Sequence, residues 1–167
     1  MGVLAAWRPK GGHVRARPEL MLNGGFEIAG AGGADVFASW IEVAGTSFIA
    51  DTVISTEVHG GSHALKLTLG VGAAMVYQNI TVVPGSSYTL TFFCRGDGTV
   101  RGLYRIYDVT HSLDIKASGA MGLVGVGYTA VSYVIIAPAG CTSVRVYFIS
   151  PNAAGSAWVD DVSVVIV

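Results

Sequence analysis

The chain has 167 residues, of which 51% are hydrophobic and 13% charged, and it contains 23 glycines. This length favours one domain with a short appendage. Low charge with many glycines is typical of β-strands joined by tight turns, and no long stretch shows the three-to-four-residue apolar spacing of a helix. The uncharged run between Lys116 and Arg145 is broken by several glycines and Pro138, which argues against a membrane-spanning segment.

The charges are unevenly distributed. The first 17 residues carry four basic residues and no acid, a charge of +4, and the other six basic and eleven acidic residues give −5. We therefore expect residues 1–19 to form an extended basic arm outside the core. The arm is either a disordered leader or a tether on a larger acidic partner. Nucleic-acid binding is disfavoured, because four charges give only modest, salt-sensitive affinity. The residues expected to contact a partner are Trp7, Arg8, Lys10, Arg15 and Arg17.

The body of the chain, residues 20–167, predicts about ten short strands separated by turn residues. The first strands are expected at 20–22, 39–41, 48–58 and 63–69, with a Gly/Ala-rich loop at 29–34. Residues 76–82 and 88–94 alternate apolar and polar residues around Pro84-Gly85, which predicts a hairpin. Further strands are expected at 100–109, 128–136, 142–149 and 158–167, and residues 111–116 as a short polar segment. This pattern predicts an all-β, two-sheet antiparallel sandwich.

Catalytic motifs are lacking in this sequence. The four histidines do not have zinc-ligand spacing, and Ser62 does not lie in a nucleophile elbow. Cys94 and Cys141 fit neither a disulfide framework nor a metal-binding pattern. We therefore expect a protein that is not an enzyme. The apolar run at residues 1–7 is too short for a signal peptide, so we expect synthesis in the cytoplasm.

Five segments, taken in order, resemble the jelly-roll carbohydrate-binding modules of families 4, 9 and 22, within the galactose-binding-like superfold. They are Asn-Gly-Gly-Phe-Glu at 23–27 with Trp40, Gly-Ser-His-Ala-Leu-Lys-Leu at 61–67, and residues 77–90, 128–138 and 159–163. The resemblance spans residues 20–167 and implies a jelly-roll domain after the arm. It indicates fold more than function, because the same sandwich also serves as an adhesion or structural module.

Members of that family usually hold a structural calcium ion. The resemblance implies that Glu27 and either Asp160 or Asp161 are side-chain ligands, with backbone carbonyls near residues 60–61. Asp160 is favoured, because it shares a strand face with apolar residues and an inward carboxylate needs a partner. The alternative is a hydrogen-bond network without metal.

Sugar binding in the family uses aromatic side chains on a concave sheet face. The resemblance therefore implies that certain aromatic side chains stack on sugar rings and that one polar side chain forms hydrogen bonds with sugar hydroxyl groups. The alternative for each aromatic residue is packing in the core. The candidates are Trp40, Tyr104, Tyr107, Tyr133 and Tyr147, with Gln78 as the polar side chain.

Three hypotheses for function follow. The basic arm and the missing export signal favour a bacteriophage virion surface component, in the capsid decoration or the tail, made in the host cytoplasm. It would stabilise the particle and contact host glycans. The second hypothesis is a glycan-binding module of an extracellular carbohydrate-active enzyme. The third is a structural homo-oligomer that uses the uncharged strands at 117–144 as its subunit interface.

Overall fold

The computed structural model describes residues 17–32, 35–43, 51–52, 57–69 and 72–167. No helix in this part of the chain is long and apolar enough to cross a membrane. The described strands are β1 (Ala29–Gly32), β2 (Asp35–Phe37), β3 (Ile41–Glu42), β4 (Asp51–Thr52), β5 (His63–Thr68), β6 (Met75–Thr81), β7 (Ser87–Arg95), β8 (Leu103–Asp108), β9 (Leu113–Ala120), β10 (Thr129–Ile136), β11 (Ser143–Ile149) and β12 (Ser156–Ile166).

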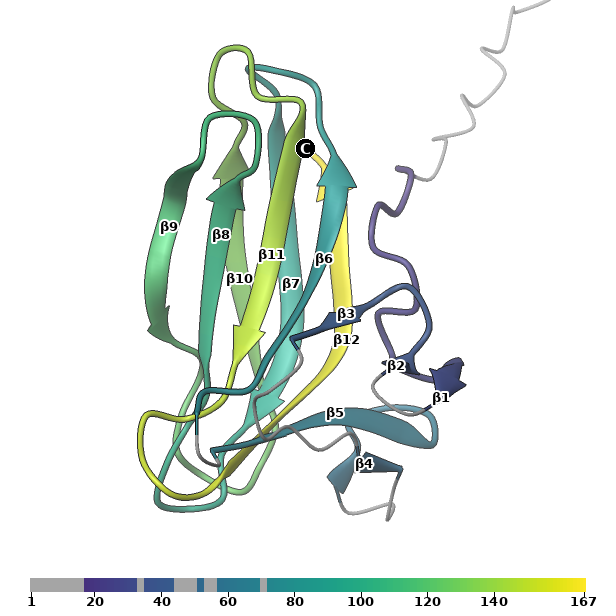
Figure 1. Ribbon diagram of the computed structural model, residues 1–167, viewed down its shortest axis with the longest axis vertical. Helices are drawn as coiled ribbons and strands as arrows, with labels where there is room; N and C mark the ends of the chain where they lie inside the picture. The colour runs from purple at the N-terminus through teal and green to yellow at the C-terminus, as the bar shows by residue number, and fades with distance from the viewer. Residues whose placement is uncertain (1–16, 33–34, 44–50, 53–56, 70–71) are drawn as a thin grey trace, which may run out of the picture.

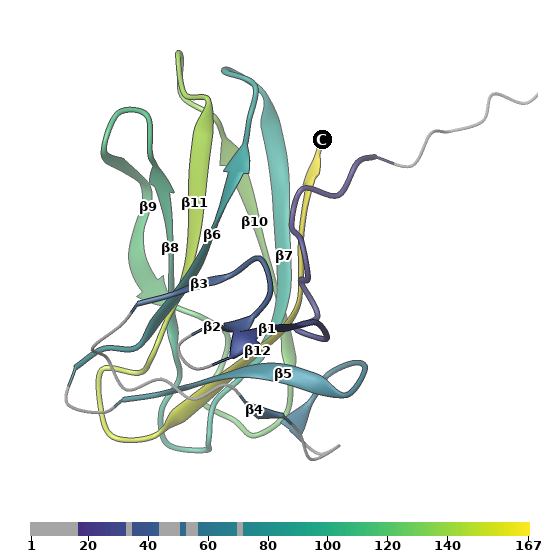
Figure 2. The same cartoon turned by 45° about the vertical axis from the view of Figure 1, so that its right-hand side comes forward.

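Two five-stranded antiparallel sheets face each other (Figures 1 and 2). Sheet A has the order β10-β7-β12-β5-β4, and sheet B has the order β3-β6-β11-β8-β9. From β5 onward the chain passes between the sheets at nearly every connection, and only β8 and β9 follow each other within one sheet. This topology confirms the predicted all-β jelly-roll sandwich.

The predicted hairpin around Pro84-Gly85 is wrong. β6 lies in sheet B and β7 in sheet A, so the connection crosses from one sheet to the other. The backbone N–H of Val83 donates to the Tyr88 hydroxyl at 2.7 Å, and that of Gly85 donates to the Ala137 carbonyl at 2.9 Å. Apolar alternation does not distinguish a hairpin from a crossing, because strands of both sheets turn one apolar face to the same core.

Three other segments differ from the sequence prediction. Residues 20–22, predicted as a short strand, form none, although the neighbouring Glu19 makes an isolated bridge with Val165. Residues 29–32, predicted as loop, form β1 and pair with β2. Residues 113–120 form the eight-residue strand β9, where the sequence predicted a short polar segment. β9 lies at the edge of sheet B and exposes most of its residues, so it lacks the alternation by which a half-buried strand is recognised. Much of the strand predicted at 48–58 lies outside the described residues.

A chain of aromatic contacts runs through the core between the sheets. The Phe92 ring of sheet A lies 5.0 Å from the Phe148 ring of sheet B and 5.2 Å from that of Tyr104. Trp40 lies 6.0 Å from Phe148 on one side and 4.9 Å from Phe26 on the other. The N-terminal segment of the domain is therefore packed into the same core as the two sheets.

The carboxylate of Asp97 ties the β7–β8 connection to the start of β12. One oxygen accepts hydrogen bonds from the Thr99 N–H (2.9 Å), the Thr99 hydroxyl (2.8 Å) and the Val100 N–H (3.0 Å), and the other accepts from the Ser156 N–H (2.9 Å). Burial raises the pKa of Asp97, but these hydrogen bonds outweigh it and hold the pKa well below its usual value.

We predict that Asp97→Asn lowers the free energy of unfolding by about 1–3 kcal/mol at neutral pH, since hydrogen bonds to a charged group are lost. Because the folded-state pKa is depressed, the ionised carboxylate adds stability above about pH 4, and this stability is lost as the pH falls toward the folded-state value. Urea unfolding of both proteins at about pH 7 and pH 2 measures the difference. A penalty of equal size at both pH values would contradict the prediction.

Candidate functional site

The outer face of sheet B carries tyrosine and arginine side chains in two neighbouring rows. In β8 and β11 they alternate with buried Ile, Val and Phe, so they point away from the core. The strand register places Arg105 opposite Tyr147 and Tyr147 opposite Tyr77. In the next row, Tyr107 pairs with both Arg145 and Asp114, and Arg145 also pairs with Asn79. We call this surface the platform; it consists of Tyr77, Asn79, Arg105, Tyr107, Asp114, Arg145 and Tyr147.

The platform side chains are held against one another. The Arg145 guanidinium lies 4.1 Å from the Tyr77 ring centre and 5.5 Å from that of Tyr147, and the two rings are 5.1 Å apart. The Arg105 guanidinium lies 4.6 Å from the Tyr107 ring and 5.6 Å from the Tyr147 ring. Contacts of this kind contribute about 0.5–1 kcal/mol each at exposed sites. The platform is therefore ordered before any ligand arrives.

A groove adjoins the platform at β6. It has a volume of about 530 Å³ and lies between the segment at 19–22 and the edge of sheet B. Asn79 belongs to both surfaces, and the exposed side chains of Leu22 and Ile41 add apolar area to the groove. A long ligand lying across the platform would continue into this groove. Its lining residues are Glu19, Leu20, Leu22, Ser39, Ile41, Gln78, Asn79, Ile80 and Thr81.

The structure divides the six predicted sugar-contacting residues. Tyr107 and Tyr147 lie on the platform. Trp40, Gln78 and Tyr104 are buried, with 4%, 6% and 7% of their surface exposed, and Tyr133 is half-buried against the core. Their sequence environments did not separate these two groups, because both kinds of residue occur in alternating strands.

Trp40 and Gln78 instead hold the N-terminal segment of the domain in place. The indole N–H of Trp40 donates to the Asn23 carbonyl at 3.0 Å. The Gln78 amide oxygen accepts from the Leu22 N–H at 2.8 Å, and its nitrogen donates to the carbonyls of Leu22 (3.0 Å) and Ser39 (2.9 Å). Gln78 therefore has a structural role at the groove: its side-chain amide holds the backbone of Leu22 and Ser39 against β6.

Five platform residues were not predicted: Tyr77, Asn79, Arg105, Asp114 and Arg145. One signal for the arginines was present in the sequence. Arg-x-Tyr occurs at 105–107 and again at 145–147, each time with an apolar residue in the middle position. Antiparallel pairing of two such strands places each arginine opposite a tyrosine, which is the observed register.

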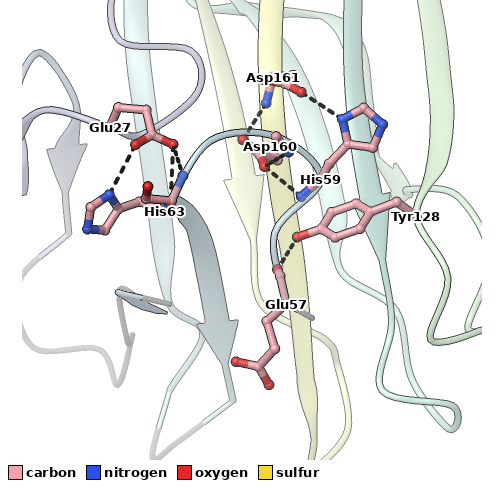
Figure 3. A network of polar contacts seen from close by, with 9 residues as sticks. Glu27, Glu57, His59, His63, Tyr128, Asp160 and Asp161 are labelled. Atoms are coloured by element: carbon pink, nitrogen blue, oxygen red, sulfur yellow. Dashed lines mark hydrogen bonds and ion pairs between the residues drawn. The ribbon is translucent and has the colours of Figure 1, made fainter. Parts of the chain in front are cut away.

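The three predicted calcium ligands lie around the loop at 59–63 (Figure 3). Asp160 of β12 is fully buried; one of its oxygens accepts from the N–H groups of His59 (2.8 Å) and Gly60 (3.0 Å), and the other from that of Asp161 (2.8 Å). Burial raises the pKa of Asp160, and these hydrogen bonds offset only part of that effect. Asp160 therefore fastens the loop to the centre of sheet A.

Glu27 fastens the other end of the same loop. One of its oxygens accepts from the N–H groups of Ser62 (2.7 Å) and His63 (3.1 Å), and the other lies 3.2 Å from His63 Nδ1. Burial alone raises the pKa of Glu27, but these contacts lower it below its usual value. The N-terminal motif at 23–27, the loop and β12 are thus joined through carboxylates.

Histidine and aromatic side chains complete the cluster in Figure 3. His59 Nδ1 lies 2.6 Å from a carboxylate oxygen of Asp161, and the His59 ring stacks on Phe93 with ring centres 3.5 Å apart. The Tyr128 hydroxyl donates to the Glu57 carbonyl. The loop is therefore held by Asp160, by Glu27 and by the contacts of the His59 ring with Asp161 and Phe93.

The side chains expected to bind calcium are already engaged by the protein's own hydrogen bonds. The described residues contain no group of three or more acidic, histidine or cysteine side chains placed to hold a metal. The carboxylates of Glu27 and Asp160 each already make three contacts with nitrogen atoms, so a calcium ion would have to share these oxygens with those contacts or displace some of them. Calcium binding stays a prediction, tested by whether calcium raises and EDTA lowers the melting temperature of the full chain, with Glu27→Gln as the control.

Of the five arm residues predicted to contact a partner, only Arg17 is among those described. Its guanidinium donates to the Ile166 carbonyl at 3.0 Å, next to the bridge between Glu19 and Val165. The chain therefore enters the domain alongside the end of β12. Trp7, Arg8, Lys10 and Arg15 lie outside the described residues, and the predicted boundary between arm and domain stays a prediction.

Comparison with solved structures shows that the fold is similar to that of jelly-roll carbohydrate-binding modules. No protein-family model matches the chain, and no curated protein sequence matches it. The structure of TmCBM61 in complex with β-1,4-galactotriose has a TM-score of 0.65 at 14% identity, covering 90% of this chain and 99% of that one. The CBM22-1 xylan-binding domain of Paenibacillus barcinonensis Xyn10C has a TM-score of 0.61 at 11% identity, covering 91% and 96%.

A third similar structure comes from a virus. The enzymatically active domain structure of bacteriophage CBA120 tailspike protein 4 has a TM-score of 0.64 at 20% identity. The match covers 89% of this chain but only 21% of that chain. At these identities the comparisons establish a shared fold, and function has to be argued from the site.

Proposed function

We propose that this protein is a non-catalytic glycan-binding module that holds an extended saccharide across the platform and the adjoining groove. The observation that carries the proposal is the ordered Tyr/Arg surface on the outer face of sheet B. Tyrosine rings offer apolar faces to a sugar ring, while hydroxyl, amide and guanidinium groups bond its hydroxyl groups. Two neighbours of the same fold are described as a galactotriose complex and a xylan-binding domain, which supports this use of the sandwich.

Tyr147 is the platform residue whose loss is expected to matter most. It lies between both arginines and beside Tyr77. We predict that Tyr147→Ala weakens glycan binding at least about tenfold, because truncating a central aromatic anchor costs about 1–3 kcal/mol. Affinity gel electrophoresis against galactan, xylan and polygalacturonate, followed by calorimetry, measures the change.

The matched control lies on the opposite sheet. Thr91→Ala on the exposed face of β7 should leave binding unchanged. Thr91→Ala should melt near the temperature of the unaltered chain, because its side chain does not belong to the core. Tyr147→Ala should stay folded and melt a few degrees lower, because its contacts with Arg105, Arg145 and Tyr77 are lost. Equal binding by Tyr147→Ala and the unaltered chain would overturn the platform as the site.

A second candidate function is that of a virion surface component, in a capsid decoration or a tail. The specific observation in its favour is the likeness to a tailspike structure. As a virion component, the module would act at the surface of the particle. The alternative is that the module is part of an extracellular enzyme, whose substrate the platform would bind. Purified virions of the parent phage, probed with an antibody against the chain, would separate the two alternatives.

Strand β10 supports assembly with a second copy of the chain. Among the strands that the structure describes it pairs only with β7, it carries no charged residue, and it exposes Val134 and Ile136. Edge strand β9 of the other sheet carries Asp114 and Lys116 and has two register shifts, features that discourage edge pairing. Antiparallel pairing of two β10 edges is self-complementary across a two-fold axis. Light scattering of the full chain, of Val134→Lys and of a chain that begins at Glu19 tests the roles of this edge and of the arm.

A further inference from the structure

The two platform arginines differ in how their charges are balanced. The Arg105 Nε atom lies 2.5 Å from an Asp114 carboxylate oxygen. Arg145 has no carboxylate within salt-bridge distance among the residues that the structure describes; its Nε donates to the Asn79 amide oxygen at 2.7 Å and its Nη1 to the Tyr147 hydroxyl at 2.9 Å. The centre of the platform therefore carries a positive charge that the described carboxylates do not neutralise.

Arg145 is also held in a fixed orientation. Its guanidinium lies over the Tyr77 and Tyr147 rings, and two of its five N–H groups are used by Asn79 and Tyr147. The remaining N–H groups keep the planar, paired geometry that matches the two oxygens of an oxyanion. Little side-chain entropy remains to be lost on binding, because neighbouring groups already order the side chain.

A neutral saccharide would gain little affinity from contact with Arg145. Placing it on Arg145 would displace water from the guanidinium and return only hydrogen bonds to neutral hydroxyl groups. An anionic substituent returns a charge-assisted, bidentate contact. The guanidinium groups also cover part of the tyrosine rings, which leaves less bare aromatic surface for stacking than a strip of tyrosines alone would offer.

We propose that the platform recognises an acidic glycan, with Arg145 bound to a carboxylate or sulfate group on a sugar ring. This inference rests on the proposed glycan-binding function and specifies its ligand class. Arg105, neutralised by Asp114, orients Tyr107 and Tyr147 beside that contact. The groove beyond Asn79, with its apolar side chains, holds the continuing chain.

The experiment compares polymers that differ only in charge. Binding of the full chain to polygalacturonate is measured against the same polymer after carboxyl reduction, and binding to dextran sulfate against dextran. We expect the acidic member of at least one pair to bind at least about tenfold more tightly, and that preference to weaken as salt is raised. The pair that shows the preference distinguishes carboxylate from sulfate.

Variants locate the effect. Arg145→Gln should abolish the acidic preference, Arg145→Lys should retain part of it, and Arg101→Gln, an exposed arginine before β8, should leave it unchanged. Equal binding of acidic and neutral members would overturn the acidic ligand while leaving the glycan-binding module intact. Absence of binding to these polymers and to neutral galactan and xylan would overturn both.

Discussion

Asp160→Asn is expected to lower the free energy of unfolding by about 2–4 kcal/mol, because a buried acceptor is replaced by a donor. Both Asp160 oxygens accept backbone N–H groups: those of His59 and Gly60 on one side and that of Asp161 on the other. An asparagine amide has one oxygen and one NH₂ group, so in either orientation its NH₂ faces a backbone N–H. The melting temperature should fall by about 5–15 °C, measured by circular dichroism in EDTA.

Asp161→Asn is the matched control. The chemical change is the same and the position adjacent, but 43% of the Asp161 side chain is exposed and its φ is 48°, a conformation that asparagine tolerates. We expect a loss below about 1 kcal/mol, from its contact with His59. Equal losses for both variants would show that the buried hydrogen bonds of Asp160 are not what holds the loop.

The sequence was informative wherever one local pattern decided the structure. Alternating apolar residues in β8, β11 and β12 predicted strands, and the order of turns and strands predicted a sandwich. The buried position of Asp160 followed from the apolar residues that share its strand face. In each case the deciding residues lie within one strand or one turn.

Prediction from the sequence was limited where residues far apart in the chain determine whether a side chain is buried or exposed. Tyr104 and Tyr107 lie in the same strand, but Tyr104 faces Phe92 across the core and Tyr107 faces solvent beside Arg105. Strand parity separates them only after one face is known to be buried. Likewise, the burial of Trp40 depends on Phe26 and Phe148, which come from other parts of the chain. The platform depends on the register between β8, β11 and β6, which no single segment encodes.

The motif Asn-Gly-Gly-Phe-Glu at 23–27 combines several such distant contacts. The Asn23 side chain donates to the carbonyls of Ile28 (2.9 Å) and Ala38 (3.0 Å) and accepts from the Ile28 N–H (3.0 Å), which closes the turn. The Gly24 carbonyl accepts from the Val162 N–H at 2.9 Å, where the pairing of β12 with β7 shifts register. The motif therefore docks its backbone directly on β12.

Gly24→Ala is consequently expected to destabilise the domain by about 2–4 kcal/mol, whereas Gly25→Ala should change its stability by less than about 1 kcal/mol. A Cβ atom on Gly24 would lie 1.9 Å from the Val162 carbonyl oxygen, so the backbone of the motif or of β12 must move and the Val162 hydrogen bond is strained. A Cβ atom on Gly25 would have its nearest neighbour, an Asp161 carboxylate oxygen, at 3.5 Å, an ordinary contact. Urea unfolding of the two variants compares the neighbouring positions directly. Similar stability of both would mean that the close backbone approach at Gly24 does not hold the motif on β12.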